Sequence, residues 1–362
     1  MNIVKATEKY ENWLSQFFKL WPQDLELKHA AMVESPFKFL RATFYRWAQV
    51  WCELCGDFDR TPKVLAVGDL HVENFGTWRD VDGRLIWGVN DFDEACKLPY
   101  AFDLIRLTVS ALMAIRESHF KLPTEDAVEA ILDGYLLGLE KRGSPFVLEE
   151  KHHWLRQIAL SELRDPVHFW DKIRKLKPAS PKEARKAKKI LGDLLPEGAS
   201  DLQISRRVAG LGSLGRPRLV AVAQWQGGLI CREAKAMAPS AVLFAAGQKK
   251  KWRQQTQEIV ELALRAPDPY YRMKGKWLVR RLSPHCSRIE IFHLPKKRDE
   301  LSLLEAMGIE TANIHLGKGP GQDIRRDLTA QRRRQIKSAV TLMREQLLAD
   351  WLEWRQACKD KY

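Results

Sequence analysis

The chain has 362 residues, of which 45% are hydrophobic, and it carries a formal net charge of +14 at pH 7. This apolar content excludes a disordered chain, and the length suffices for two or three lobes around a full hydrophobic core. No apolar run approaches the roughly 18 residues of a membrane-spanning helix, and the positive charge favours polyanionic partners such as nucleotides, nucleic acids or anionic lipid surfaces.

The N-terminus and the cysteines lead us to expect a cytoplasmic protein. Residues 1–8 lack the basic and then apolar pattern of a signal peptide. The six cysteines are scattered, as is typical of a reducing compartment. Cys52 and Cys55 form a C-x-x-C pair in a helix-like stretch, but no second pair stands at metal-site spacing. We therefore do not expect zinc or redox chemistry.

Residues 1–60 are predicted to be helical. Ser35 and Pro36 are the residue types of an N-cap and of a first helical position. Apolar residues then repeat at helical spacing. These are Phe37, Leu40, Phe44, Trp47 and Trp51.

Two strand-like runs, residues 64–67 and 85–89, are each followed by a polar motif. The first motif contains Gly68-Asp69-Leu70-His71 and Asn74, and the second is Asn90-Asp91-Phe92-Asp93. A turn signal lies between the runs at Asp82-Gly83, so we predict two paired strands with the polar side chains gathered where they meet. Such a cluster can hold a divalent metal and place a carboxylate beside it, as phosphoryl transfer requires.

The rest of the chain is predicted as helices, then a β-rich region, then helices again. Helical patterns cover residues 102–139 and 150–195, recur at 240–265, and dominate from residue 298. Strands are expected at 204–209, 219–223, 229–235, 277–282 and 288–292.

Basic residues are dense at four places, which are usually solvated helix faces. They lie at residues 172–177, 182–189, 249–251 and 332–334. No zinc-finger, cold-shock or RNP-type motif accompanies them, so nucleic acid stays a partner that no motif indicates.

The segment Gly210-Leu211-Gly212-Ser213-Leu214-Gly215 is a G-x-G-x-x-G loop between two predicted strands. In a dinucleotide-binding fold the third glycine opens a helix, whereas Arg216-Pro217 and a strand follow here. A glycine loop between strands is the kinase arrangement, in which backbone N–H groups cover the nucleotide phosphates. The alternative is an ordinary β-hairpin with a glycine-rich turn.

Lys235 lies on the next predicted strand, where a kinase places the lysine that pairs with the α- and β-phosphates. Arg232 is the competing assignment. The following helix offers Glu258 or Glu261 as the ion-pair partner of that lysine.

The two polar motifs resemble known enzymes. Gly68-Asp69-Leu70-His71 with Asn74 resembles the catalytic loop of aminoglycoside and choline kinases, and Asn90-Asp91-Phe92-Asp93 resembles their metal-binding segment. The chain resembles domain-of-unknown-function family 2252, an uncharacterised bacterial family, more closely. The motifs that carry this second resemblance are Ser35-Pro36-Phe37 with Phe39-Leu40-Arg41, residues 68–76, residues 90–95, Asp103-Leu104 with Arg106-Leu107, and residues 210–215.

The order of the motifs is reversed relative to an ordinary kinase, in which the glycine loop comes first. The resemblance therefore implies an α+β, protein-kinase-like two-lobed fold that is circularly permuted, with the catalytic-loop lobe before the glycine-loop lobe. The helix that normally precedes the catalytic loop is expected at 301–315. The implied parts are N-terminal helices (1–60), a helical lobe with the catalytic and metal-binding loops (61–200), a small β-rich nucleotide-binding lobe (201–297) and C-terminal helices that complete the helical lobe (298–362).

The resemblance implies ATP and Mg2+ as cofactors. Asp69 would orient or deprotonate the acceptor hydroxyl, and His71 would brace the loop or act in catalysis. Asn74 and Asp91 would hold the metal, with Asp93 as a second metal contact or a structural carboxylate. The nucleotide-binding set would be Gly210, Gly212, Ser213, Gly215, Lys235 and Glu258. Two further roles are expected: Asp103 ties the catalytic loop to the helix below it, and Arg41 neutralises a buried carboxylate.

These residues predict an ATP- and Mg2+-dependent phosphotransferase. Asp91 and Pro99 are only eight positions apart, which leaves no room for a long activation segment and favours a small-molecule hydroxyl acceptor. The basic segment from about 140 to 200 would build the acceptor site and hints at an acidic acceptor. One alternative is a metal-dependent phosphoesterase, for which a downstream Gly-Asn-His motif is missing. The others are a non-catalytic nucleotide-binding or interaction module and an enzyme that transfers the nucleotidyl group.

Overall fold

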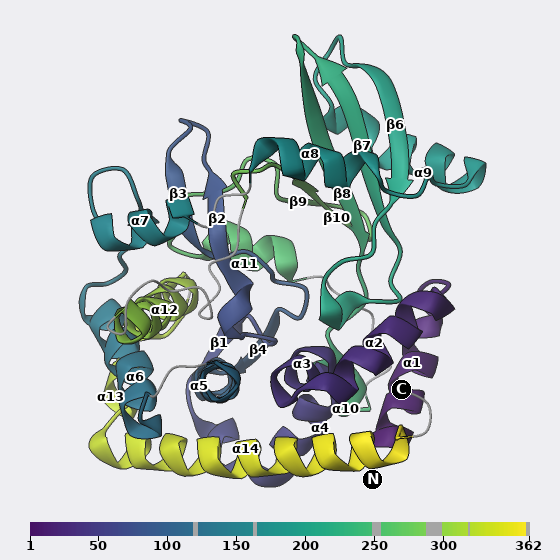
Figure 1. The fold of residues 1–362 in the computed structure, drawn as a ribbon. Coiled ribbons are helices and arrows are strands. Elements are labelled where there is room, and N and C mark those ends of the chain that lie inside the picture. The colour runs from purple at the N-terminus through teal and green to yellow at the C-terminus, as the bar shows by residue number, and fades with distance from the viewer. Residues whose placement is uncertain (119–121, 162–164, 248–254, 287–298, 318, 360–362) are drawn as a thin grey trace.

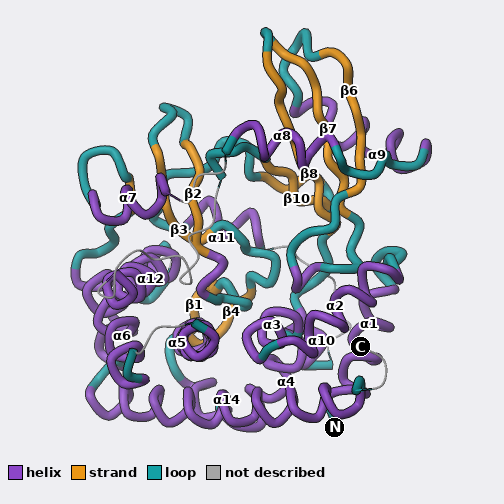
Figure 2. The backbone as a smooth tube through the Cα atoms, viewed as in Figure 1, coloured by secondary structure: helices purple, strands orange, loops and turns teal. Residues whose placement is uncertain are grey.

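The computed structural model describes residues 1–118, 122–161, 165–247, 255–286, 299–317 and 319–359. Helices and several small antiparallel sheets form a mixed fold, which confirms the α+β class (Figure 1). Helices occupy most of the lower part of the molecule, and the largest sheet stands at the upper right (Figure 2). No helix within the described ranges is both long enough and apolar enough to cross a bilayer.

The N-terminal region is helical, as predicted. Its elements are α1 (Ile3–Ser15), α2 (Pro22–Glu34), α3 (Pro36–Ala42), α4 (Phe44–Leu54) and the 3-10 turn η1 (Gly56–Arg60). The Ser35 side chain accepts the N–H of Lys38 at the start of α3, which confirms the predicted N-cap. The apolar period from 37 to 51 is divided at Thr43, which ends α3 and precedes α4 with φ −121° and ψ 36°, outside the helical range.

The two strands that precede the polar motifs do not pair with each other, so that prediction is wrong. Instead, the residues after the first motif form strand β2 (Phe75–Arg79). This strand makes a hairpin with the second predicted strand, β3 (Leu85–Val89), through the Asp82-Gly83 turn. This leaves β1 to pair with β4. The elements of this region are β1 (Lys63–Ala66), η2 (Val72–Asn74), β2 (Phe75–Arg79), β3 (Leu85–Val89), β4 (Cys96–Pro99) and β5 (Phe146–Val147).

The two motifs nevertheless meet, as predicted. The backbone N–H of Asn90 donates to the Asn74 carbonyl at 2.9 Å. This bond lies next to the Phe75–Val89 pair, at the open end of the β2–β3 hairpin. The hairpin therefore brings both polar segments to one end of the sheet.

The predicted helix over 102–139 is two helices, α5 (Tyr100–Glu117) and α6 (Thr124–Glu140), with Pro123 at the start of the second. The C-terminal region contains α12 (Asp299–Leu316), α13 (Gly321–Asp327) and α14 (Ala330–Ala357). The backbones of α6 and α12 touch, because a Cβ on Gly134 would lie 2.0 Å from the Glu305 carbonyl oxygen. Helix α14 runs beneath α4 and α5 (Figure 1).

The β-rich region folds as an antiparallel sheet in the order β6-β7-β8-β10-β9. The predicted strands near 204, 219, 229 and 277 are present, and the one predicted at 288–292 lies outside the described residues. The elements are α7 (His153–Ser161), α8 (Pro166–Arg174), α9 (Pro181–Leu191), η3 (Gly192–Leu194), β6 (Ser200–Arg206), η4 (Leu211–Ser213), β7 (Arg218–Trp225), β8 (Gly228–Ala236), α10 (Ala241–Ala245), α11 (Thr256–Leu262), β9 (Arg272–Lys274) and β10 (Trp277–Arg281).

Helix α9 covers one face of this sheet with Ala187, Ile190 and Leu191. Its lysines point outward, which confirms a solvated helix face for the basic run 182–189. The basic run 249–251 falls on residues outside the described ranges.

Candidate active site

The catalytic-loop motif begins with a turn that only glycine fits. Gly68 has φ +82°, and a Cβ there would lie 2.5 Å from the Glu94 carbonyl oxygen. The backbone N–H groups of Val67 and Gly68 donate to the two carboxylate oxygens of Asp103 at 2.7 and 2.9 Å. Asp103 is completely buried on α5, which confirms that it ties the loop to the helix.

Asp69 follows this turn, and its two carboxylate oxygens differ in their partners. Arg106 of α5 donates to Oδ1 from Nε at 2.8 Å and also from Nη2. The guanidinium is completely buried between Phe44 and Trp47, with its central carbon 5.0 and 4.9 Å from their ring centroids. Oδ2 accepts no hydrogen bond from the part of the chain that the structure describes.

Burial raises the pKa of Asp69 to about 6, although the charge of Arg106 lowers it. A carboxyl group with this pKa is ionised at neutral pH and is still basic enough to accept a proton from an acceptor hydroxyl. No local pattern predicted the Arg106 contact; the only signal was the family motif in which that residue stands.

His71 and Asn74 hold each other at the start of η2. The N–H of His71 donates to Asn74 Oδ1 at 2.6 Å, and the N–H of Asn74 donates to the His71 carbonyl at 2.8 Å. The predicted brace of the loop at His71 is therefore present. Next to them, Arg41 forms an ion pair with the buried Glu73 at 2.7 Å, as predicted.

The second polar motif supplies a pair of carboxylates, which Lys235 of β8 bridges. Its Nζ lies 3.3 Å from Asp91 Oδ1 and 2.5 Å from Asp93 Oδ1. Burial and the neighbouring Asp91 raise the pKa of Asp93 to about 6. Burial acts to raise the pKa of Asp91, but Lys235 holds it below its usual range. The pair thus presents one firmly ionised carboxylate and one that is readily protonated.

Lys235, not Arg232, is the cation of β8 that reaches the carboxylates. Arg232 lies on the opposite side of the strand, where its Nε donates to the Leu194 carbonyl and its guanidinium stacks on Tyr270 at 4.1 Å. The predicted ion pair between Lys235 and Glu258 or Glu261 is wrong, because the partners of Lys235 are the two aspartates.

Glu258 belongs to a different place in the molecule. Helix α11 is anchored beside the second motif by Thr256, whose hydroxyl donates to the Phe92 carbonyl at 2.9 Å. From there Glu258 lines a separate cavity together with Lys63 and Lys97, and Glu261 accepts a hydrogen bond from Gln257. Neither glutamate belongs to the site.

The glycine loop lies directly over the catalytic loop. A Cβ on Gly212 would lie 2.8 Å from the Arg41 carbonyl oxygen and 3.7 Å from Asp69 Oδ2. Gly210 and Gly215 have φ values of +75° and +89°, a conformation that favours glycine. The Gly215 carbonyl accepts the N–H of Trp21 at 2.9 Å, so α2 fastens the end of the loop.

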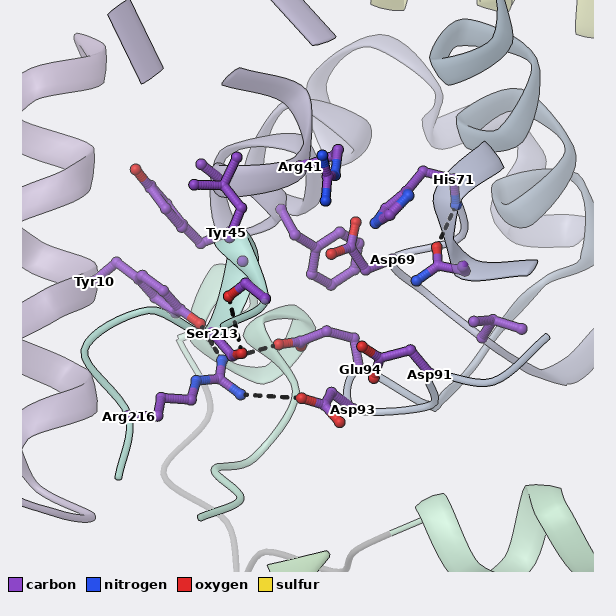
Figure 3. Close-up of a pocket in the computed structure, with 17 residues that line it drawn as sticks. Tyr10, Arg41, Tyr45, Asp69, His71, Asp91, Asp93, Glu94, Ser213 and Arg216 are labelled. Carbon is purple, nitrogen blue, oxygen red and sulfur yellow. Dashed lines mark hydrogen bonds and ion pairs between the residues drawn. The ribbon is translucent and has the colours of Figure 1, made fainter. Parts of the chain in front are cut away.

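Two further residues of the site were not predicted. Arg216, just after the glycine loop, donates to Glu94 at 3.2 Å and to the Tyr10 hydroxyl at 3.1 Å, and lies 3.9 Å from Asp93 (Figure 3). Glu94 also accepts the N–H of Ala241 at 2.7 Å. Each of the two residues is the direct sequence neighbour of a recognised motif, which was the available signal.

These groups surround one cavity of about 50 Å³ (Figure 3). Small-molecule sites usually measure about 300–1,000 Å³, so a nucleotide requires the glycine loop to lift. The cavity is lined by Tyr10, Arg41, Ala42, Phe44, Tyr45, Val67, Asp69, His71, Asn74, Asp91, Asp93, Glu94, Gly210, Leu211, Gly212, Ser213 and Arg216.

The oxygen donors of Asn74, Asp91 and Asp93 are of the kind that Mg2+ prefers. Within the described ranges, no group of three or more His, Cys, Asp or Glu side chains is arranged to hold a metal ion. The ammonium group of Lys235 lies between the two carboxylates, so a metal there has to displace it.

A search of the curated proteins and a search of the solved structures find no match to the chain. Residues 20–188 match the model of a family described as "Uncharacterized protein conserved in bacteria (DUF2252)". The matched part contains both polar motifs and Arg106 but ends before the glycine loop. Over residues 20–188, somewhat less than half of its length, the chain is therefore similar to the bacterial family DUF2252.

Proposed function

We propose that the protein is an ATP- and Mg2+-dependent phosphotransferase with a circularly permuted, kinase-like arrangement of its lobes. The observation that supports this proposal best is the convergence at one cavity of Asp69, the Asp91–Asp93 pair and the loop 210–215. The loop is more than 100 positions from the aspartates in the chain. Phosphoryl transfer depends mainly on positioning and charge neutralisation, for which these groups suffice.

Asp69 is the residue that would orient or deprotonate the acceptor hydroxyl. Arg106 fixes its Oδ1, so the carboxylate cannot rotate freely, while Oδ2 is the oxygen nearer the glycine loop. A pKa of about 6 leaves the group ionised at pH 7. These properties are those of a general base in a fixed position.

Lys235 and the glycine loop would bind the phosphates of the donor. Asn74, Asp91 and Asp93 would hold Mg2+, which supplies neutralisation of the charge on the transferred group. Because Lys235 now pairs with both aspartates, its release from them would free an ammonium group for the phosphates. Lifting of the glycine loop would supply the volume that the cavity lacks.

The position of α12 supports the permuted order. His315, near the end of α12, lies with Nε2 3.1 Å from Asp103 Oδ2, and Asp103 holds the turn before Asp69. A C-terminal helix thereby supports the catalytic loop from behind, as the helix that precedes this loop does in a kinase of ordinary order. The proposed acceptor is a small hydroxyl compound, since β4 begins only five positions after Asp91.

Isothermal titration of ATP, with and without Mg2+, tests the proposal. We expect binding in the micromolar to millimolar range that depends on Mg2+ and that Asp91→Ala weakens. Asp82→Ala, in the exposed hairpin turn, is the matched control and should bind like the wild type. If no nucleotide binds, the proposal is wrong. Transfer of AMP, detected by mass spectrometry of the products, would identify nucleotidyl transfer instead.

A further inference from the structure

Three arginines converge on one buried carboxylate beside Lys235. Glu233 of β8 is completely buried. Its Oε1 accepts hydrogen bonds from Arg218 at 3.0 Å and Arg280 at 2.8 Å, and its Oε2 accepts one from Arg207. These four residues are called the Glu233 cluster below.

The cluster lies on the face of the sheet that Lys235 uses to reach the polar motifs. Arg280 is directly opposite Glu233 in the β8–β10 register, and Arg218 is directly opposite Lys235 in the β7–β8 register. Paired residues point to the same face, as do residues two apart on one strand. Arg218 also donates to the Ser213 hydroxyl at 2.7 Å, which connects the cluster to the glycine loop.

The other end of the same face is apolar. There Phe169 and Ile173 of α8 pack against Val220 and Cys231, and in Figure 1 α8 crosses in front of the strands. The apolar part begins directly beside Glu233, whose partner on β7 is Val220, and the cluster is connected to the cavity through Ser213.

The cluster carries more positive charge than its carboxylate can neutralise. Three guanidinium groups face one Glu233 carboxylate. The charges of Asp91 and Asp93 also act on Arg280 and Arg218. With Lys235 included, four cations stand against three carboxylates, a surplus of one charge. Burial lowers the pKa of Arg218, although Glu233 acts to raise it, and the nearby charges of Arg280 and Arg207 lower it further. The side chains of Arg207 and Arg280 retain 18% and 22% exposure, so both are within reach of a ligand. This surplus suits an anionic group such as a phosphate, which planar guanidinium groups bind with paired hydrogen bonds.

The same residues depart from the kinase pattern. The lysine strand of protein kinases reads V-A-I-K, with an apolar residue two positions before the lysine, whereas residues 232–235 read Arg-Glu-Ala-Lys. Glu233 and its arginines thus replace an apolar surface near the phosphates by a charged one. Such a surface recognises charge rather than the shape of an aromatic base.

We infer that Arg207, Arg218 and Arg280 bind the phosphate chain of the donor, and that the donor is selected by this chain and not by its base. The inference rests on the proposed function and specifies its donor class: nucleoside triphosphates of any base, and inorganic tripolyphosphate. Glu233 keeps the three guanidinium groups in position until the phosphates engage them.

Titration of the wild-type protein with ATP, GTP, CTP and inorganic tripolyphosphate, each with Mg2+, tests the inference. We expect the four dissociation constants to agree within about tenfold. Arg280→Gln should weaken all four by about tenfold or more, as expected for loss of a charged hydrogen bond. Arg272→Gln, an exposed arginine on β9 of the same sheet, is the matched control and should leave all four unchanged.

Two results would overturn the inference while leaving the proposed function intact. One is binding of ATP more than about tenfold tighter than that of GTP, CTP and tripolyphosphate. The other is unchanged affinity in folded Arg280→Gln, with folding checked by circular dichroism. If this variant fails to fold, the comparison of the four ligands on the wild type decides alone. Absence of binding by all four ligands would contradict the proposed function as well.

Discussion

Asp69 combines a fixed position with a shifted proton affinity. Arg106 immobilises one carboxylate oxygen from beneath, and burial raises the pKa to about 6. The arginine is itself held between two aromatic rings. The direction of the carboxylate therefore depends on the packing of α4 and α5 around it.

The pKa of Asp69 predicts the pH dependence of the proposed reaction. Only the ionised carboxylate can accept a proton, so the rate of Mg-ATP hydrolysis, with water in place of the acceptor, should rise as the pH increases through about 6 and then level off. A malachite-green assay between pH 5 and 8 measures this.

Asp93 has a similar pKa and serves to identify the titrating group. In Asp93→Asn the reaction rate should still rise with pH through about 6, because Asp69 still titrates. All rates should be lower than in the wild type. A rise that disappears in this variant, or a flat profile in the wild type, would contradict the assignment to Asp69.

At the scale of elements, the turn between β1 and η2 determines where the catalytic loop lies. Gly68 needs a positive φ and also leaves no space for a side chain. Gly83, in the β2–β3 turn, has a similar φ of +77° but nothing within 4 Å of its missing Cβ. A side chain at Gly83 would therefore cost only backbone strain, whereas a side chain at Gly68 would cost backbone strain and a steric clash.

Substitution of each glycine by alanine should give unequal losses of stability. Gly83→Ala should lower the free energy of unfolding by about 1–2 kcal/mol, the cost of a left-handed backbone. Gly68→Ala should lose about 1–3 kcal/mol more, because its Cβ would overlap the Glu94 carbonyl. Urea unfolding measures both values, and equal losses would show that the Gly68 turn can relax.

Element pairing illustrates how far sequence reasoning extends. The strand runs at 64–67 and 85–89 and the turn at Asp82-Gly83 were recognisable from local composition. The partner of β1 was not, because β4 is separated from it by the whole hairpin and carries no distinctive pattern. The interrupted helix at Thr43 was also missed, since the apolar period continues across the break and no glycine or proline marks it.

At the scale of the molecule, the N-terminal helices hold the glycine loop down on the catalytic loop. The hydrogen bond from Trp21 to Gly215 and the contact of Gly215 with Leu25 fasten it. The cavity beneath the loop measures about 50 Å³. The proposed binding of a nucleotide therefore requires these contacts to separate.

Hydrogen exchange should therefore change when Mg-ATP binds. We expect the amide of Trp21 to lose protection, because the Gly215 carbonyl that it binds has to move with the loop. Mass spectrometry of deuterium uptake with and without Mg-ATP measures this, with the Leu148 amide, which donates to the Leu85 carbonyl away from the cavity, as an internal reference. Unchanged protection of Trp21 at saturating nucleotide would contradict a lifting loop.

The residue sequence was sufficient to locate the two polar motifs and the glycine loop that meet at the cavity, and to predict most of the elements that carry them. The motifs were recognisable because each is defined by residue types a few positions apart. They contain Gly68, Asp69, Asn74, Asp91 and the glycine loop. Folding alone fixed which charges meet: Arg106 with Asp69, Lys235 with Asp91 and Asp93, and Glu258 away from the site. Such pairs join segments tens to hundreds of residues apart, and their formation depends on how helices and sheets pack, which no local pattern records.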